Sequence, residues 1–194
     1  MKQVIYEKTI TINNQVLAIN ANEKNGCFVE ILLALYRELM AMLAHHHKIL
    51  FLRVDIRIFD YTPNNKIISD YLRKVKRWLS IHYDIKRVGH LWVREIEKAK
   101  NQHYHLILLL DGSKIQHPKK LIDYLEHLAY YRDMAKPFTP QQCYLMIFRK
   151  DFKNFDRAFY RGSYLAKERG KGYKDKTAND FSASRIRLLK KTLN

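Results

Sequence analysis

The sequence predicts an α+β fold in which helices flank a central, largely antiparallel sheet. Segments with apolar residues at helical spacing alternate along the chain with short apolar, β-branched segments that are typical of strands. Two of these strand segments are separated by only a four-residue polar link, which favours an antiparallel hairpin. A chain of 194 residues is long enough for one domain with a sizeable core.

The first half of the chain is expected to supply an arm, two helices and a strand. Residues 2–20 alternate weakly, which predicts an extended arm or a hairpin with the Asn-Asn pair 13–14 as its turn. Residues 28–45 have helical spacing and end beside three histidines, which suit a helix C-terminus better than a metal site. Residues 48–59 are apolar, with alternating charge in their second half, and predict a strand. Residues 65–83 form an amphipathic helix with a basic face.

The second half is expected to complete the sheet and to end in a basic tail. Residues 86–97 and 102–110 predict the two strands of the hairpin. The remaining elements, in chain order, are a helix opened by Pro118 (118–135), a strand (142–150), a helix that includes Gly162 (152–168) and a short basic helix near the C-terminus (184–191). Ferredoxin-like and RNA-recognition folds share this arrangement, and in them one face of the sheet is open for a ligand.

We expect three regions: an N-terminal arm and helix (1–47), the main domain (48–172) and a basic tail (173–194). Only two cysteines are present and they form no CxxC pair, which fits a reducing cytosol. The N-terminus lacks the apolar core of a signal peptide, and the longest apolar stretch has the charge pattern of an amphipathic helix. A cytoplasmic protein without a membrane span is therefore expected.

The net charge points to an acidic polymer as partner. Lys and Arg number 36 against 19 Asp and Glu, so the formal charge is +17, more than solubility alone requires. The basic residues of the C-terminal part are the expected contacts to a phosphate backbone: Lys171, Lys174, Lys176, Arg185, Arg187, Lys190 and Lys191.

Two histidines stand one residue apart at the entrance of the second hairpin strand. Residues i and i+2 of a strand share a face, so His103 and His105 point the same way and Tyr104 points into the core. Glu95 and Glu97 share one face of the partner strand, and either carboxylate could fall beside the histidines. Two imidazoles and a carboxylate suit Mg²⁺ or Mn²⁺. The alternative is that these are ordinary polar residues on a solvated face.

A second candidate group lies on the expected helix 152–168. Tyr164 and Lys167 are three residues apart and project together, and Tyr160 lies one turn earlier on the same side. A tyrosine oxygen beside a cation can attack phosphorus and form a covalent intermediate. The alternative is that these rings only pack against neighbouring elements.

Taken together, the two motifs resemble those of the HUH endonucleases, the rolling-circle replication initiators and relaxases. The stretches VREIEKAKNQHYHLILLLDG (93–112) and GSYLAKERGKG (162–172) resemble the replication-initiation, gene II-like, proteins of filamentous inoviruses and their prophage relatives. The resemblance covers roughly residues 48–172 and implies an HUH-type fold.

The resemblance implies a role for each motif residue. His103, His105 and Glu95 would bind the metal, with Glu97 as the alternative carboxylate. Tyr164 would cut one DNA strand and keep the 5′ phosphate, with Lys167 in support, and Tyr160 as a possible second tyrosine is left open.

A rolling-circle initiator of this kind would act on single-stranded or hairpin origin DNA in the cytoplasm of a bacterial host. It would leave a free 3′ hydroxyl for the host helicase and polymerase. The alternative function is that of a non-catalytic nucleic-acid-binding or regulatory protein of a phage or mobile element.

Overall fold

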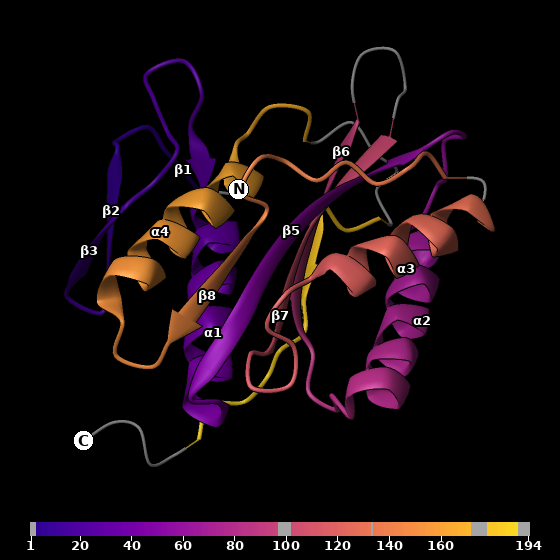
Figure 1. The fold of residues 1–194 in the computed structure, drawn as a ribbon. Coiled ribbons are helices and arrows are strands. Elements are labelled where there is room, and N and C mark those ends of the chain that lie inside the picture. Colours follow the sequence, from indigo (N-terminus) through magenta and orange to yellow (C-terminus); the bar gives the residue numbers. More distant parts are fainter. Residues whose placement is uncertain (1–2, 97–101, 133, 172–177, 190–194) are drawn as a thin grey trace.

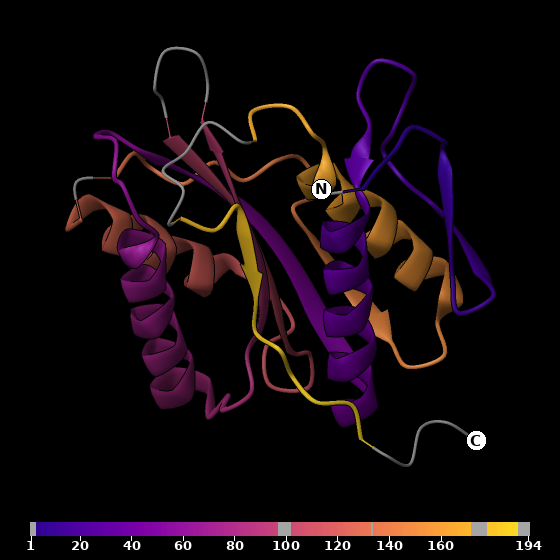
Figure 2. The ribbon, with the colours of Figure 1, turned by 180° about the vertical axis from the view of Figure 1, so that it is seen from behind.

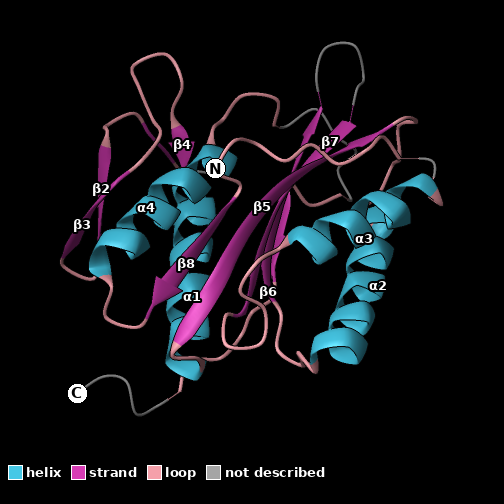
Figure 3. Cartoon of the chain, viewed as in Figure 1, coloured by secondary structure: helices cyan, strands magenta, loops and turns pink. Residues whose placement is uncertain are grey.

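The computed structural model describes residues 3–96, 102–132, 134–171 and 178–189 (Figure 1). The elements are β1 (Val4–Ile5), β2 (Thr9–Ile12), β3 (Gln15–Ala18), β4 (Cys27–Phe28), α1 (Val29–His45), β5 (Lys48–Ile58), α2 (Lys66–Tyr83), β6 (Gly89–Ile96), β7 (Gln102–Asp111), α3 (Lys119–Tyr130), β8 (Tyr144–Phe148), α4 (Phe152–Ser163), the 3₁₀ turn η1 (Tyr164–Ala166) and β9 (Phe181–Ala183). Figure 3 shows the same chain coloured by helix and strand.

The central sheet has five antiparallel strands in the order β8-β5-β7-β6-β9. Together with the four α-helices of the described ranges, it confirms the expected α+β class. The β6–β7 hairpin is also confirmed, and its register places Glu95 directly opposite His103. The link of this hairpin lies outside the described residues.

Helices cover both faces of the sheet, α1 and α4 on one side and α2 and α3 on the other (Figures 1 and 2). The expectation of a sheet face left open for a ligand was therefore wrong. Strand β5 shows why both faces of the sheet are covered, because its side chains are apolar on both faces. Ile49 and Phe51 pack with α1 and α4, whereas Leu50 and Leu52 pack with α2 and α3. Such a strand needs an apolar layer on each side.

The N-terminal arm forms two small antiparallel sheets that pack beside α1 and α4. Strands β2 and β3 form a hairpin, as expected, and β1 pairs with β4. Asn13 and Asn14 have φ values of 50° and 63°, the left-handed pair that a two-residue hairpin turn requires. Ile10 and Leu17 of this hairpin are buried in the same hydrophobic cluster as α1, α4 and the sheet.

Two predicted helices are shorter in the structure than in the sequence pattern. Helix α3 ends at Tyr130 and not at residue 135, because the chain extends toward Pro137 and Met134 forms a backbone bridge with Ile58. Helix α4 ends at Ser163, and the chain continues as the 3₁₀ turn η1.

The C-terminal segment also differs from the prediction. Residues 181–183, within the expected basic tail, add the edge strand β9 to β6. Residues 184–189, expected in a basic helix, have no helical structure. Ser184 donates its backbone N–H to the carbonyl of His90, and Arg185 has a φ of 59°, so the chain follows the sheet edge.

Gly162 explains how α4 approaches α1. A Cβ atom at this position would lie 2.6 Å from a methyl carbon of Leu35 on α1, so a larger side chain would separate the two helices. The glycine in the last turn of α4 is thus required by packing, despite its low helix propensity. Within the described ranges, no helix has both the length and the apolar character that crossing a membrane demands.

Candidate active site

Four polar side chains share one face of the sheet near one end of its central strands. The register pairs His105 of β7 with Asp55 of β5, and His103 of β7 with Glu95 of β6. Directly paired residues point to the same face, so these four lie on the side of α1 and α4. Tyr104 points the other way and is fully buried, as expected.

The imidazole of His105 lies between two carboxylates. Its Nδ1 is 2.8 Å from Oδ1 of Asp55, and its Nε2 is 3.1 Å from Oε2 of Glu95. Burial alone would lower the pKa of His105, but the hydrogen bonds and charges of the two carboxylates outweigh it and raise the pKa to about 8. Burial likewise opposes ionisation of Asp55 and Glu95, yet His105 and the nearby cations hold the pKa of both carboxyl groups below its ordinary value.

The second oxygen of Glu95 is taken by Lys171. The ammonium lies 2.6 Å from Oε1, and only 1% of the lysine side chain is exposed. We expected Lys171 to contact DNA phosphates, but the structure places it inside this cluster. Gly170 makes the approach possible, because its φ of +74° turns the chain and its carbonyl accepts a hydrogen bond from the N–H of Ile96.

Tyr164 lies over this cluster, at the first position of η1. Its ring meets the ring of His105 edge to face, with the centroids 5.6 Å apart. The guanidinium carbon of Arg53 is 4.2 Å from the centroid of the Tyr164 ring, and the ammonium of Lys167 is 5.2 Å from it. Tyr164 is 36% exposed. Although the α-helix ends before them, Tyr164 and Lys167 are still neighbours.

Arg53 connects this tyrosine to the carboxylate cluster. Its guanidinium donates two hydrogen bonds to the carboxylate of Asp55, at 3.2 and 3.0 Å. The same group lies against the Tyr164 ring. A planar guanidinium held in this way has a fixed orientation and can direct its remaining N–H groups at an anion.

The N-terminal arm holds the segment that carries Tyr164. The backbone N–H of Asn20 donates to the hydroxyl of Ser163 at 2.8 Å, directly before the tyrosine. On the other side of it, the N–H of Glu168 donates to the carbonyl of Gly26 at 3.0 Å. The 3₁₀ turn is therefore fixed at both ends by residues outside the helix from which it extends.

A hollow of about 150 Å³ opens beside the two candidate tyrosines. Tyr160, Tyr164 and Arg53 line it, together with Arg161 and the segment around Gln142. Arg161 donates a hydrogen bond to the carbonyl of Gln142 at 2.5 Å. Two tyrosine side chains and two guanidinium groups thus face the same small space.

The remaining predicted residues lie elsewhere. Arg185 and Arg187 are exposed on the segment after β9, where the carbonyl of Arg187 hydrogen-bonds with His45. The following predicted residues lie outside the described part of the chain: Glu97, Lys174, Lys176, Lys190 and Lys191.

The imidazoles of His103 and His105 and the carboxylate of Glu95 are groups that bind divalent cations. Within the described ranges, however, no three His, Cys, Asp or Glu side chains are grouped closely enough to hold such an ion. Nε2 of His105 and Oε2 of Glu95 are 3.1 Å apart. Neighbouring ligands of an octahedral ion with bonds of about 2.1 Å are separated by about 3 Å. Asp55 at Nδ1 is the kind of carboxylate that orients a metal-binding imidazole.

The sequence prediction missed Asp55 and Arg53. The sequence does show that these residues share a face of the predicted strand 48–59, since Arg53, Asp55 and Arg57 are spaced by two. That pattern does not reveal which strand lies next to β7. Only the pairing of β5 with β7 brings Asp55 to His105.

Comparison with known proteins adds a family. Residues 10–184 match the family model described as the YagK/YfjJ C-terminal domain. No curated protein and no solved structure matches the chain. The match covers most of the described fold, from the β2–β3 hairpin to the end of β9. The chain therefore belongs to the YagK/YfjJ C-terminal domain family.

Proposed function

We propose that the protein initiates rolling-circle replication by nicking single-stranded origin DNA with Tyr164. The observation that carries this proposal is the position of a partly exposed tyrosine against a histidine–carboxylate cluster, between two cations. A tyrosine that only packed in the core would be buried, whereas Tyr164 is 36% exposed with Arg53 and Lys167 beside its ring. The proposal is also supported by the charge of +17, which favours a polyanionic substrate.

The proposed reaction is a transesterification. The phenol oxygen of Tyr164 forms a bond to phosphorus while the bond from phosphorus to the 3′ oxygen breaks. The phenol gives up its proton, and the departing 3′ oxygen takes one up to become a hydroxyl. The 5′ phosphate remains on the enzyme as a phosphotyrosine diester, so the bond energy is retained and the step can reverse. A host polymerase, with a helicase, would extend the free 3′ end.

The cations around Tyr164 have two tasks in this step. Arg53 and Lys167, which lie against the Tyr164 ring, would stabilise negative charge as it develops on the phenol oxygen and on the transferring phosphate. Its paired hydrogen bonds to Asp55 would hold the Arg53 guanidinium in place during the step. Because Arg53 is already oriented and would not need to reorganise during the reaction, its effect would be larger than that of a mobile surface cation.

His103, His105 and Glu95 would hold a Mg²⁺ or Mn²⁺ ion. When bound, such an ion polarises the scissile phosphate and neutralises charge in the transition state. Asp55 would keep the His105 ring oriented through Nδ1, and Lys171 would keep Glu95 oriented through Oε1.

Tyr160 is proposed as a second tyrosine for strand transfer. It is 45% exposed and lines the same hollow as Tyr164. With Tyr164 already esterified, a second phenol in that hollow could attack another phosphate and allow a further nick.

The test is a trapped adduct. Wild-type protein, Tyr164→Phe and the matched control Tyr160→Phe are incubated with single-stranded origin-like DNA and Mn²⁺ or Mg²⁺, then separated on a denaturing gel. We expect an adduct with wild type and with Tyr160→Phe, and none with Tyr164→Phe, although all three bind DNA. Mass spectrometry should place the nucleotide on Tyr164. A wild-type protein that binds DNA but forms no adduct with either metal would instead be a binding or regulatory protein.

A further inference from the structure

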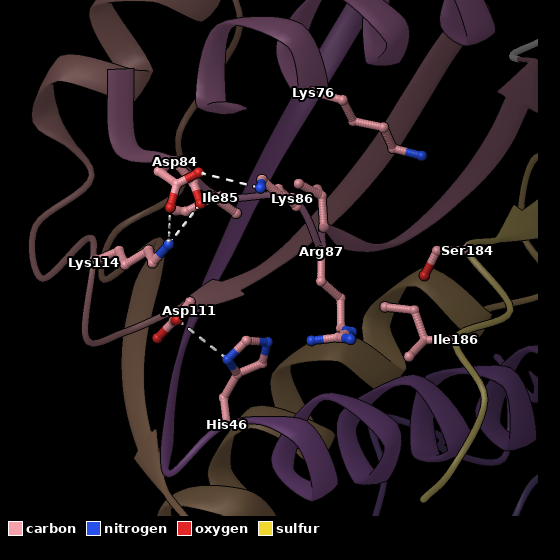
Figure 4. Close-up of a pocket in the computed structure, with 11 residues that line it drawn as sticks. His46, Lys76, Asp84, Ile85, Lys86, Arg87, Asp111, Lys114, Ser184 and Ile186 are labelled. Atoms are coloured by element: carbon pink, nitrogen blue, oxygen red, sulfur yellow. Dashed lines mark hydrogen bonds and ion pairs between the residues drawn. The ribbon is translucent and has the colours of Figure 1, made fainter. Parts of the chain in front are cut away.

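We propose that a basic pocket at the end of the sheet opposite Tyr164 binds backbone phosphates of a duplex stem in the DNA that the enzyme nicks. This inference rests on the proposed function. The pocket has a volume of about 550 Å³ and is shown in Figure 4. We call it the distal pocket, and the following residues line it: His46, Lys76, Asp84, Ile85, Lys86, Arg87, Val88, Asp111, Lys114, Ser184 and Ile186.

The distal pocket is built where five parts of the fold meet. The C-terminal ends of α1 and α2 contribute His46 and Asp84, and the end of β7 contributes Asp111. The segment that leads into β6 and the segment that leaves β9 close the remaining sides. None of the residues proposed for the nicking reaction lines this pocket.

Positive charge exceeds negative charge in the distal pocket. Four Lys and Arg side chains line it, against two carboxylates. Both carboxylates are already engaged, since Asp84 pairs with Lys114 at 2.8 Å and Asp111 pairs with Nδ1 of His46 at 3.2 Å. Arg87 and Lys76 therefore provide the excess charge. An anion is the ligand that would balance it, and Arg and Lys are the side chains that most often contact phosphate.

Two further observations favour an anion. Figure 4 shows the His46 imidazole and the Arg87 guanidinium directed toward each other across the pocket. Nε2 of His46 is buried and has no hydrogen-bond partner among the described residues. Burial lowers the pKa of His46 and of Lys76. The charge of Glu38 opposes the shift of Lys76, but this carboxylate already accepts hydrogen bonds from Ser184 and Arg185, so further negative charge in the pocket would stabilise both cations. A phosphate in the pocket would supply that charge.

The distance between the nicking site and the distal pocket indicates how long a DNA stem must be to reach both. Strand β7 runs from His105 at the nicking site to Asp111 at the distal pocket. Six residues of antiparallel strand span about 20 Å. A B-form duplex rises 3.4 Å per base pair, so about six base pairs cover this distance. A hairpin stem next to the nick could therefore reach the pocket, and a stem of two or three base pairs could not.

The test compares two DNA hairpins that share the same single-stranded nick site. One has a stem of about twelve base pairs and the other a stem of about three, so only the first covers the ~20 Å path. Binding is measured by fluorescence anisotropy without metal. The pocket variant is Lys76→Gln/Arg87→Gln. The matched control is Lys74→Gln/Arg77→Gln, which removes the same charge from exposed positions of α2 outside the pocket.

We expect the pocket variant to bind the long stem at least tenfold more weakly than the control does, and the short stem equally well. Its salt dependence on the long stem should also fall by about two in the slope of log K against log salt, as for two lost phosphate contacts. Equal losses for both variants, or equal losses on both DNAs, would overturn the assignment. So would failure of wild type to distinguish the two stems.

Two further experiments distinguish DNA phosphate from free phosphate as the ligand, and the distal-pocket proposal from the nicking proposal. Inorganic phosphate is titrated into wild type and into the pocket variant by calorimetry. Binding of free phosphate to wild type alone, with no effect of stem length, would show that the pocket takes a free anion and not DNA. Adduct formation on the short hairpin with Mn²⁺ should be the same for both variants. If no adduct forms but the stem-length effect is present, the nicking proposal fails and the distal pocket assignment stands.

Discussion

His90 provides a prediction about stability that depends only on the fold. This residue of β6 is 7% exposed, and its Nδ1 has no hydrogen-bond partner among the described residues. Burial, with a smaller effect of the Lys76 charge, lowers the pKa of His90 to about 4. The native state therefore keeps this ring neutral at a pH where an exposed histidine would already be protonated.

The sign of the effect follows from the difference in proton binding. An unfolded chain takes up a proton at His90 near pH 6.5, whereas the folded chain does so only near pH 4. Below pH 6.5 the unfolded state binds more protons, so the free energy of unfolding decreases as the pH falls. The two pKa values give a loss of about 2 kcal/mol by pH 5 and a limit of about 3 kcal/mol below pH 4.

The assay is denaturant unfolding of wild type and His90→Gln between about pH 7 and pH 5. Other groups, including His105 with its opposite shift, titrate in both proteins, so the difference between the two curves reports His90 alone. Wild type should lose about 2 kcal/mol more than His90→Gln over this range. The exposed His47→Gln serves as control and should follow wild type. Parallel pH profiles for wild type and His90→Gln would refute the argument.

Two predictions concern the proposed active site. His103→Ala and Glu95→Gln should each abolish the metal-dependent adduct and the rise in melting temperature that Mn²⁺ gives wild type. Glu97→Gln should keep both the adduct and the rise. An unchanged rise in melting temperature with Mn²⁺ in the first two variants would disprove the ligand assignment. Ser163→Ala removes the hydroxyl that accepts from Asn20, and since one such hydrogen bond contributes about 1 kcal/mol, adduct formation should slow about fivefold with DNA affinity unchanged. A Ser163→Ala enzyme of full rate would show that the arm does not position Tyr164.

Much of the fold could be predicted from local pattern. The helical spacing of α1 and α2 and the alternation in the β6–β7 hairpin are properties of neighbouring residues, and the structure confirms these elements. The hairpin also indicated that a carboxylate would lie near the histidines. Because its link is short and side chains alternate with a period of two, Glu95 or Glu97 could fall beside His103 or His105, and the register of the structure pairs Glu95 with His103.

What could not be predicted depends on pairing between distant segments. Strand β9 has three residues and becomes recognisable only when it lies against β6. Asp55 reaches His105 because β5 lies beside β7, and the sequence contains no local signal for that neighbour. The sequence predicts Lys171 as a surface residue, because it does not show that the turn at Gly170 brings the Lys171 side chain to Glu95.

The position of Tyr164 combines local and distant causes. Gly162 lets α4 pack closely on α1, which brings the end of α4 to the edge of the histidine–carboxylate cluster. The α-helix then stops at Ser163, where Asn20 of the arm binds the serine hydroxyl. The 3₁₀ turn that follows leaves the Tyr164 ring partly exposed above His105. The arm is therefore part of the structure that aims the tyrosine, although the side chains proposed for the chemistry all come from later in the chain.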